Sequence, residues 1–278
     1  MGWTLTGDAE EYAQRVEAFL VADPIRHTIG AVGIQSWRQG QVSGASIFGW
    51  RTDPDGAVTD AASMTPPWSL LIEAVSEEHL PSLVEALDGV HAELPGVHGE
   101  VGLAAAFAAM WRASRGVTVE LGMVMRLFAL GDLKPPRHLV AGYARRVTDD
   151  DLPLATKWMQ AFVDELGDPH DNPGDEIRRR AEHGTVWFWC DTSGTPVSMA
   201  GNTAPTAGVA RVGPVYTPAE LRGRGYAEAA THSACRGLRD EGVRAVLFAD
   251  QANPTSTGIY RALGFAPVSD RAVLLFRT

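Results

Sequence analysis

The first half of the chain alternates between two spacings of apolar residues. Apolar positions that recur every three or four residues predict helices, and short β-favouring runs bounded by turn residues predict strands. The expected helices span residues 8–22, 77–88 and 99–115, and the expected strands span residues 44–51, 57–64, 68–74 and 117–129.

The second half continues with the same two kinds of element. The stretch "TDDDLP" places acids in the first turn of a helix, and Gly242 follows the last helically spaced apolar residue of another. The expected strands are residues 139–147, 185–190, 196–205, 209–217, 244–249, 265–268 and 271–276, and the expected helices are residues 149–166, 175–183, 224–241 and 254–263.

A proline-rich stretch, "GDLKPPRHL", separates the two halves. Its paired prolines interrupt either kind of secondary structure. We therefore predict two domains, residues 1–135 and 136–278, in a chain of 278 residues. Both halves follow the order helices, central strands, helix, strand, which predicts an α/β fold with a mixed sheet and suggests an internal duplication.

A glycine-rich turn lies between the strand at 209–217 and the helix at 224–241. It reads Arg222-Gly223-Arg224-Gly225-Tyr226-Ala227. Glycines at the start of a helix let an anion, typically a phosphate, approach backbone N–H groups that lack internal partners. Glu228 stands where a dinucleotide fold needs a third glycine, and the chain has no Gly-Lys step for a P-loop. A connection without any ligand remains the alternative.

A second stretch changes this interpretation. After the strand at 244–249 come Asn253, Ser256, Tyr260 and then Gly264-Phe265, in the pattern N-x-x-[SA]…Y-x-x-x-G-F. With the turn, which fits Q/R-x-x-G-x-G/A, this stretch resembles the GNAT superfamily of N-acetyltransferases. The resemblance covers about residues 138–278. It implies a GNAT fold there, and acetyl-CoA or another acyl-CoA as co-substrate. The first half is expected to be a GNAT-like or another α/β domain without a CoA motif. At most it resembles a degenerate GNAT copy, as in tandem proteins with one active half.

The resemblance also implies roles for individual residues. Backbone groups of Val215, Tyr216 and Thr217 would pair with the pantetheine arm, on a strand that is splayed from its neighbour. The turn from Arg222 to Ala227 (Arg222, Gly223, Arg224, Gly225, Tyr226 and Ala227) would hold the pyrophosphate. Asn253 would hydrogen-bond the pantetheine, and Ser256 would touch the donor. Pro214 has no N–H, so we expect a bulge or the edge of the splay there. Gly264 and Phe265 are expected to pack at the helix exit.

Acyl transfer to an amine needs a proton acceptor for the amine and a proton donor for the leaving thiolate. The resemblance places Tyr260 near the CoA sulfur and so implies it as the donor, with a tyrosine that only packs in the core as the alternative. The strand "ARVGPVYT" carries no carboxylate, where many family members place one, so the base is open. Asp250 is one candidate, with a capping or ion-pair role as its alternative. Glu165, Asp168 and His170 are further candidate bases, and the alternative for each is a solvated loop residue without a catalytic role. If a chain of water molecules accepts the proton, the reaction needs none of these bases.

The charge and composition of the chain indicate which kinds of partner it can bind. The net charge is −10, with −9 in residues 1–136 and −1 in residues 137–278, so no basic face predicts nucleic-acid binding. The acidic half favours solubility or the attraction of a cationic substrate. No secretory signal or apolar span suggests a membrane, and two cysteines without metal-ligand spacing fit the cytoplasm and predict no metal. We expect an acyl-CoA-dependent N-acetyltransferase acting on a small amine, with a non-catalytic acyl-CoA sensor as the alternative, and leave a homodimer open.

Overall fold

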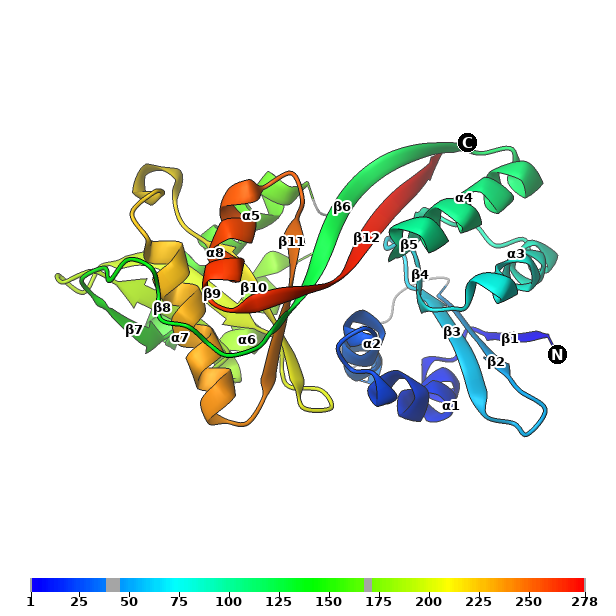
Figure 1. Cartoon of the computed structure of the whole chain (residues 1–278), viewed down its shortest axis with the longest axis horizontal. Coiled ribbons are helices and arrows are strands. Elements are labelled where there is room, and N and C mark those ends of the chain that lie inside the picture. The colour runs from blue at the N-terminus through cyan, green and yellow to red at the C-terminus, as the bar shows by residue number, and fades with distance from the viewer. Residues whose placement is uncertain (1, 39–45, 168–171, 278) are drawn as a thin grey trace. The chain divides into compact units, whose positions relative to one another are not determined.

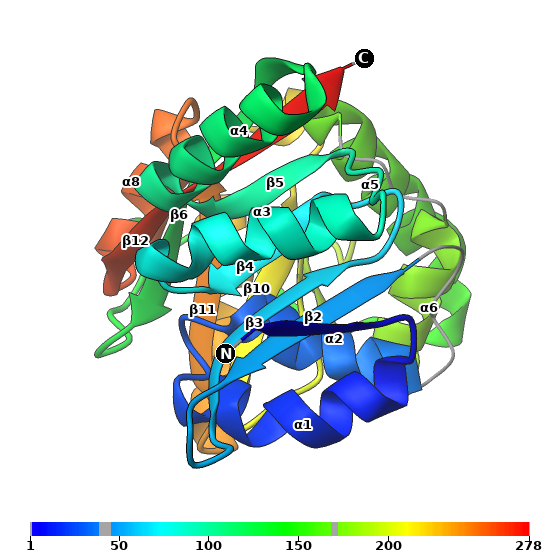
Figure 2. The same ribbon diagram turned by 90° about the vertical axis from the view of Figure 1, so that its right-hand side faces the viewer.

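The computed structural model describes residues 2–38, 46–167 and 172–277. They divide into two compact units. Unit 1 comprises Met1–Leu127, Asp250–Ala252 and Val268–Thr278, and unit 2 comprises Phe128–Ala249 and Asn253–Pro267. Figures 1 and 2 show the chain in two views.

Unit 1 contains a sheet whose strands follow the order β1-β2-β3-β4-β5-β12. The pairs are antiparallel except for β4 with β5, which run parallel. Its strands are β1 (Trp3–Thr6), β2 (Ile47–Thr52), β3 (Val58–Met64), β4 (Leu70–Ala74) and β5 (Gly96–Glu100). Its helices are α1 (Ala9–Ala22), α2 (Thr28–Arg38), η1 (Glu77–His79), α3 (Leu80–Gly89) and α4 (Val101–Arg115). Two further strands, β6 (Thr118–Leu130) and β12 (Phe265–Arg277), contribute residues to both units.

Unit 1 has a core on each face of its sheet. Residues of α3 and α4 pack with Ala62, whereas residues of α1 and α2 pack with Ala61. Neighbouring residues of a strand point to opposite faces, so the two helix pairs cover opposite faces of the sheet, as Figure 2 shows.

Unit 2 repeats this arrangement with the strand order β11-β10-β9-β8-β7. Its strands are β7 (Tyr143–Arg146), β8 (Val186–Cys190), β9 (Pro196–Asn202), β10 (Val209–Tyr216) and β11 (Arg244–Asp250). Its helices are η2 (Asp149–Asp151), α5 (Leu152–Leu166), α6 (Pro173–Glu182), η3 (Ala219–Leu221), α7 (Tyr226–Asp240) and α8 (Pro254–Ala262). Phe188 packs with α5 and α6, whereas its neighbours Trp187 and Trp189 pack toward α7.

Side-chain caps set several helix starts. The Asp8 side chain accepts the N–H groups of Glu10 and Glu11 at the start of α1. Thr148 and Asp151 form a capping box at η2, where the sequence predicts acids in the first turn. These contacts satisfy amides that the helices leave without internal partners.

The order of elements is the same in the two halves of the chain. Each runs strand, two α-helices, three strands, α-helix, strand, α-helix, strand, with short 3₁₀ turns between some of them. The predicted α/β fold with a mixed sheet and a repeated order of elements is therefore confirmed. Within the described part of the chain, no helix is long and apolar enough to cross a membrane.

The compact units depart from the expected division into residues 1–135 and 136–278 at the carboxyl end. Val268–Thr278 belongs to unit 1, where β12 pairs with β5 from Arg271↔Glu100 to Leu275↔Gly96. Ala272 and Phe276 are buried in the core formed with α3 and α4. The physical reason is burial: the apolar residues of the last strand complete the unit 1 core.

Candidate active site

Strands β10 and β11 start as a parallel pair and then part. Their register runs from Val209↔Arg244 to Arg211↔Val246, although β10 continues to Tyr216 and β11 to Asp250. Beyond Arg211, β10 therefore has no ladder with β11 among the described residues. Unpaired strand edges expose backbone N–H and C=O groups that another extended chain can bind. The splay implied for Val215 and Tyr216 is present.

A bulge interrupts β10 on its other side. Its partners on β9 step from Asn202 to Ala200 while β10 steps from Val212 to Val215, so β10 holds one extra residue. Pro214 lies in this bulge, where a residue without an N–H breaks no ladder bond. The expected bulge at Pro214 is confirmed.

The glycine-rich turn after β10 presents free amides. Gly225 caps α7 with φ +85°, and Gly223 has φ +76°. Such positive φ values favour glycine. No acceptor among the described residues binds the N–H groups of Gly225, Tyr226, Ala227 or Glu228. These amides lie at the positive end of the helix dipole, so the turn fits an anion such as a diphosphate.

Tyr260 lies on α8, in the core between that helix and the sheet. It is 9% exposed, and its ring meets Phe265 edge-on at a centroid distance of 6.0 Å. Burial, and then the neighbouring Cys235, raise the pKa of Tyr260 to about 12. The phenol is therefore protonated at neutral pH and able to donate a hydrogen bond. Its contact with Phe265 agrees with the packing role expected for that residue.

A splayed strand, a bulge, an anion-accepting turn and a buried tyrosine thus occur in one unit. Residues 154–265 match the family model described as the acetyltransferase (GNAT) family. Residues 154–265 are a GNAT acetyltransferase domain. The resemblance inferred from the turn and from Asn253 to Phe265 is confirmed.

Solved structures extend the likeness to the whole chain. A GNAT-family acetyltransferase from Colwellia psychrerythraea has 10% identity and a TM-score of 0.66, with 99% of both chains covered. A GCN5-related N-acetyltransferase from Sphaerobacter thermophilus has 17% identity and a TM-score of 0.64, covering 99% of this chain and 95% of the other. A tandem GNAT protein from the clavulanic acid biosynthesis pathway has 14% identity and a TM-score of 0.56, covering 99% and 98%. At these identities the likeness concerns the fold, and no curated protein matches the sequence.

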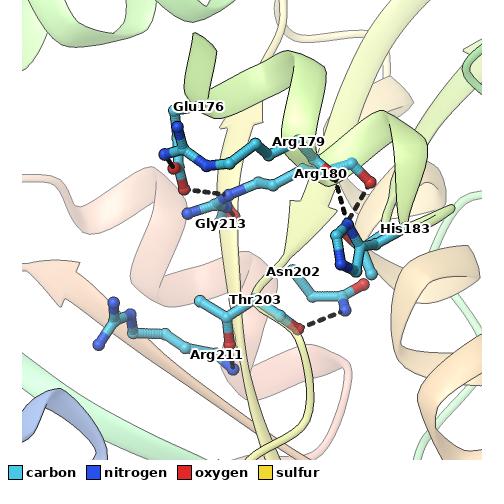
Figure 3. Close-up of polar contacts among 9 residues, drawn as sticks. Glu176, Arg179, Arg180, His183, Asn202, Thr203, Arg211 and Gly213 are labelled. Carbon is cyan, nitrogen blue, oxygen red and sulfur yellow. Dashed lines mark hydrogen bonds and ion pairs between the residues drawn. The ribbon is translucent and has the colours of Figure 1, made fainter. Parts of the chain in front are cut away.

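Helix α6 holds the bulge of the GNAT domain, a contact that the sequence did not indicate (Figure 3). An Arg180 guanidinium N–H donates to the Gly213 carbonyl, and Arg180 Nε donates to Glu176 at 2.6 Å. Burial raises the pKa of Glu176, but Arg180 and Arg179 outweigh it and the pKa is lowered. An ionised Glu176 therefore orients Arg180 toward the bulge.

Replacing Arg180 by methionine should lower turnover about tenfold or more, because a hydrogen bond from a charged group contributes about 1.5–3 kcal/mol and the bulge loses its external support. Steady-state kinetics would measure this, with Arg178→Met as the matched control. Arg178 is exposed on the same helix, and we expect its replacement to leave turnover unchanged. Equal rates for the two variants would show that Arg180 does not act on the reaction.

The Arg222 side chain is directed to protein groups. Its Nε donates to the Thr217 carbonyl at 2.9 Å, and its Nη2 donates to both Glu165 oxygens at 2.6 and 2.8 Å. The Thr217 hydroxyl in turn lies 2.8 Å from the Ser198 hydroxyl. Arg222 thus links the end of β10 to α5 and shapes the turn, while pyrophosphate binding by Arg222 and Arg224 stays a prediction. Glu165 is engaged by this ion pair.

Asn253 and Ser256 form the cap of α8. Asn253 Oδ1 accepts the Ser256 N–H at 3.1 Å, and Asn253 itself is exposed. The cap uses the carbonyl oxygen and leaves the two amide N–H groups of Asn253 to donate elsewhere. This geometry is compatible with the predicted hydrogen bond from Asn253 to the pantetheine.

The Asp250 side chain forms a local hydrogen bond with the backbone. Its Oδ1 accepts the Ala252 N–H at 2.8 Å, as expected of the capping alternative. Asp250 is the last residue of β11 and is grouped with unit 1. Its action as a base stays a prediction. Asp168 and His170 lie outside the described residues.

The turn of unit 1 that corresponds to the glycine-rich turn differs in kind. Between β4 and α3 the chain reads Val75-Ser76-Glu77-Glu78-His79, without glycine. The buried carboxylate of Asp60 accepts the Ser76 N–H at 2.7 Å. In unit 1 the Asp60 carboxylate thus already accepts the Ser76 N–H, whereas the corresponding turn of unit 2 leaves its backbone N–H groups free to bind an anion. This agrees with a GNAT-like first half whose turn is not built for a phosphate.

Proposed function

We propose that this protein transfers the acyl group of acetyl-CoA, or of another acyl-CoA, to the primary amine of a small molecule. The observation that carries the proposal is the cradle of four free amides, Gly225–Glu228, at the end of a strand that parts from its neighbour. A diphosphate fits the amides, and an extended amide-containing arm fits the strand edge. The turn between Arg222 and Ala227 and the edge at Val215, Tyr216 and Thr217 would thus bind one donor.

The proposed acyl transfer needs only a few protein groups. The neutral amine attacks the thioester carbonyl carbon, the carbon–sulfur bond breaks, and the thiolate leaves. A backbone N–H at Val215 or Tyr216 would polarise the carbonyl. The Tyr260 hydroxyl would protonate the thiolate, and the amine would lose its proton to Asp250 or to water. The acidic first half of the chain favours approach of a cationic amine over a nucleic acid.

The alternative is a module that binds acyl-CoA without turning it over. It is favoured by one observation: none of the residues Val209–Tyr216 of β10 is a carboxylate. To separate the two functions, the protein would be mixed with acetyl-CoA and a panel of amines while thiol release is followed. Turnover of one amine supports the enzyme, whereas CoA binding without turnover of any amine supports the module.

Tyr260→Phe should lower kcat by about a hundredfold while changing the KM for acetyl-CoA little, because a positioned general acid contributes about 10²–10⁴-fold. The ring and its packing against Phe265 are kept, so folding should be preserved. Tyr143→Phe is the matched control, since Tyr143 is 50% exposed in the same unit. A rate equal to that of the control would remove Tyr260 from the mechanism.

We place the reaction in the cytoplasm. Both cysteines, Cys190 and Cys235, are free and buried, as expected in a reducing compartment. Fractionation of cells that produce the protein would test this.

A further inference from the structure

The segment between β6 and β7 crosses the amino end of α7. We call residues 134–140 the strap; in Figure 1 it is part of the green coil that leads to β7. The Lys134 N–H donates to the Leu263 carbonyl at 3.0 Å, which anchors the strap at the end of α8. From there it runs past the first turn of α7, and all of these residues belong to unit 2.

The strap is joined to α7 through Glu228. The Arg137 N–H donates to Glu228 Oε1 at 2.9 Å, and the Arg137 guanidinium lies 3.2–3.3 Å from both carboxylate oxygens. The Glu228 side chain is 3% exposed, whereas that of Arg137 is 51% exposed. A buried carboxylate in the first turn of α7 therefore depends on a guanidinium from outside the helix for its charge partner.

A second contact joins the strap to the anion cradle itself. A Cβ on Gly225 would lie 3.0 Å from Val140 Cγ1 and 3.7 Å from His138 Cβ. The strap thus lies against the residue that caps α7, beside the free amides. The positive φ favours glycine there, and a Cβ would require Val140 to shift by a few tenths of an ångström.

The negative charge of Glu228 affects anion binding because Glu228 lies in the first turn of α7. A carboxylate in the first turn of a helix is attracted by the same partial positive charge that attracts a phosphate. Two like charges within a few ångströms of each other repel, and the repulsion is larger where water is excluded. Without compensation, Glu228 would disfavour a diphosphate at Gly225–Glu228.

We propose that Arg137 is a positioning residue for the acyl donor. Its guanidinium neutralises Glu228, so that the amino end of α7 attracts the donor's diphosphate, and it holds the strap against Gly225. Arg137 acts through Glu228 and the strap. This inference rests on the proposed use of an acyl-CoA by the same site.

The test compares CoA binding in a small set of variants by calorimetry. Arg137→Ala removes the guanidinium but keeps the backbone N–H that reaches Glu228. We expect its affinity for CoA to fall about tenfold, with a matching rise in the KM for acetyl-CoA and little change in kcat. Adding Glu228→Gln to this variant should return the affinity to within about twofold of the wild type, because the unpaired charge is gone. Arg137→Lys keeps the charge and should remain within about threefold.

Arg239→Ala is the matched control, since Arg239 is an exposed arginine in the last turn of α7. Its affinity should equal that of the wild type. An Arg137→Ala variant that binds CoA like this control would overturn the inference, as would a double variant no better than Arg137→Ala. If Arg137→Ala does not fold, Arg137→Met takes its place in both comparisons. A wild-type protein that does not bind CoA would instead refute the proposed function itself.

Discussion

Gly225→Asp is expected to abolish measurable binding of CoA. Gly225 caps α7 with φ +85° and contributes one of the free amides of the cradle. An aspartate there would place a carboxylate where the diphosphate is expected. Two like charges about 4 Å apart repel by about 4 kcal/mol at an effective dielectric constant of 20, which lowers affinity about a thousandfold. Calorimetric titration with CoA would measure this.

The matched control for that variant is Gly208→Asp. Gly208 has φ +75° in the turn between β9 and β10, and a Cβ there would meet no atom within 4 Å. The two substitutions therefore impose a similar backbone strain, but only Gly225 lies at the cradle and within 3.0 Å of Val140 through an added Cβ. We expect Gly208→Asp to bind CoA like the wild type. Undiminished CoA affinity in Gly225→Asp would refute the assignment of the turn as the donor site.

Arg271→Ala is expected to destabilise unit 1 by about 3–5 kcal/mol, because removing one partner of a buried ion pair leaves the other charge uncompensated. Arg271 is fully buried, and its Nη1 lies 3.2 Å from Glu73 Oε2, whose side chain is 2% exposed. Its Nη2 also donates to the Arg26 carbonyl at 2.6 Å. Urea unfolding at pH 7 would measure the loss, and hydrogen exchange of β5 would show that it occurs in unit 1.

The control is Arg277→Ala, on the same strand. Arg277 pairs with Glu120 at 3.1 Å, but the two side chains are 56% and 58% exposed. Exposed pairs contribute about 0–1 kcal/mol, so this variant should unfold nearly like the wild type. Replacing Glu73 by glutamine together with Arg271→Met should cost less than Arg271→Ala, since no buried charge is left. Equal stability of the two single variants would contradict a structural role for the buried pair.

Several elements were not foreseen because their sequences are poor formers of the structure they adopt. Helix α2 contains Gly30, whose N–H donates to Glu73 at 2.6 Å and whose Cβ would lie 2.9 Å from the same carboxylate. Strand β5 contains Gly99, whose Cβ would lie 2.7 Å from Ile72. Glycine lowers the helix and strand propensity at both places but permits the close approach of neighbours. Strand β1 was also not predicted, and the segments at 265–268 and 271–276 form one strand, β12.

Some features of the site could likewise be predicted from the sequence, and others could not. The turn from Arg222 to Ala227 and the spacing of Asn253 and Tyr260 are local patterns, so the sequence alone was enough to indicate the GNAT family and a phosphate-binding turn. The contacts of Arg180 with Gly213, of Arg222 with Glu165 and of Arg137 with Glu228 join residues 33, 57 and 91 positions apart. No spacing rule links such pairs.

The sequence by itself determined the class of fold, the repeated order of elements and the glycine-rich turn at the start of α7, because backbone propensity and glycine conformation act over a few residues. Only the tertiary structure decided that the last strand contributes to the unit 1 core, that Arg222 faces Glu165, and that the strap lies on the cap of α7. These outcomes follow from burial of apolar surface and pairing of buried charge, which depend on which distant segments meet.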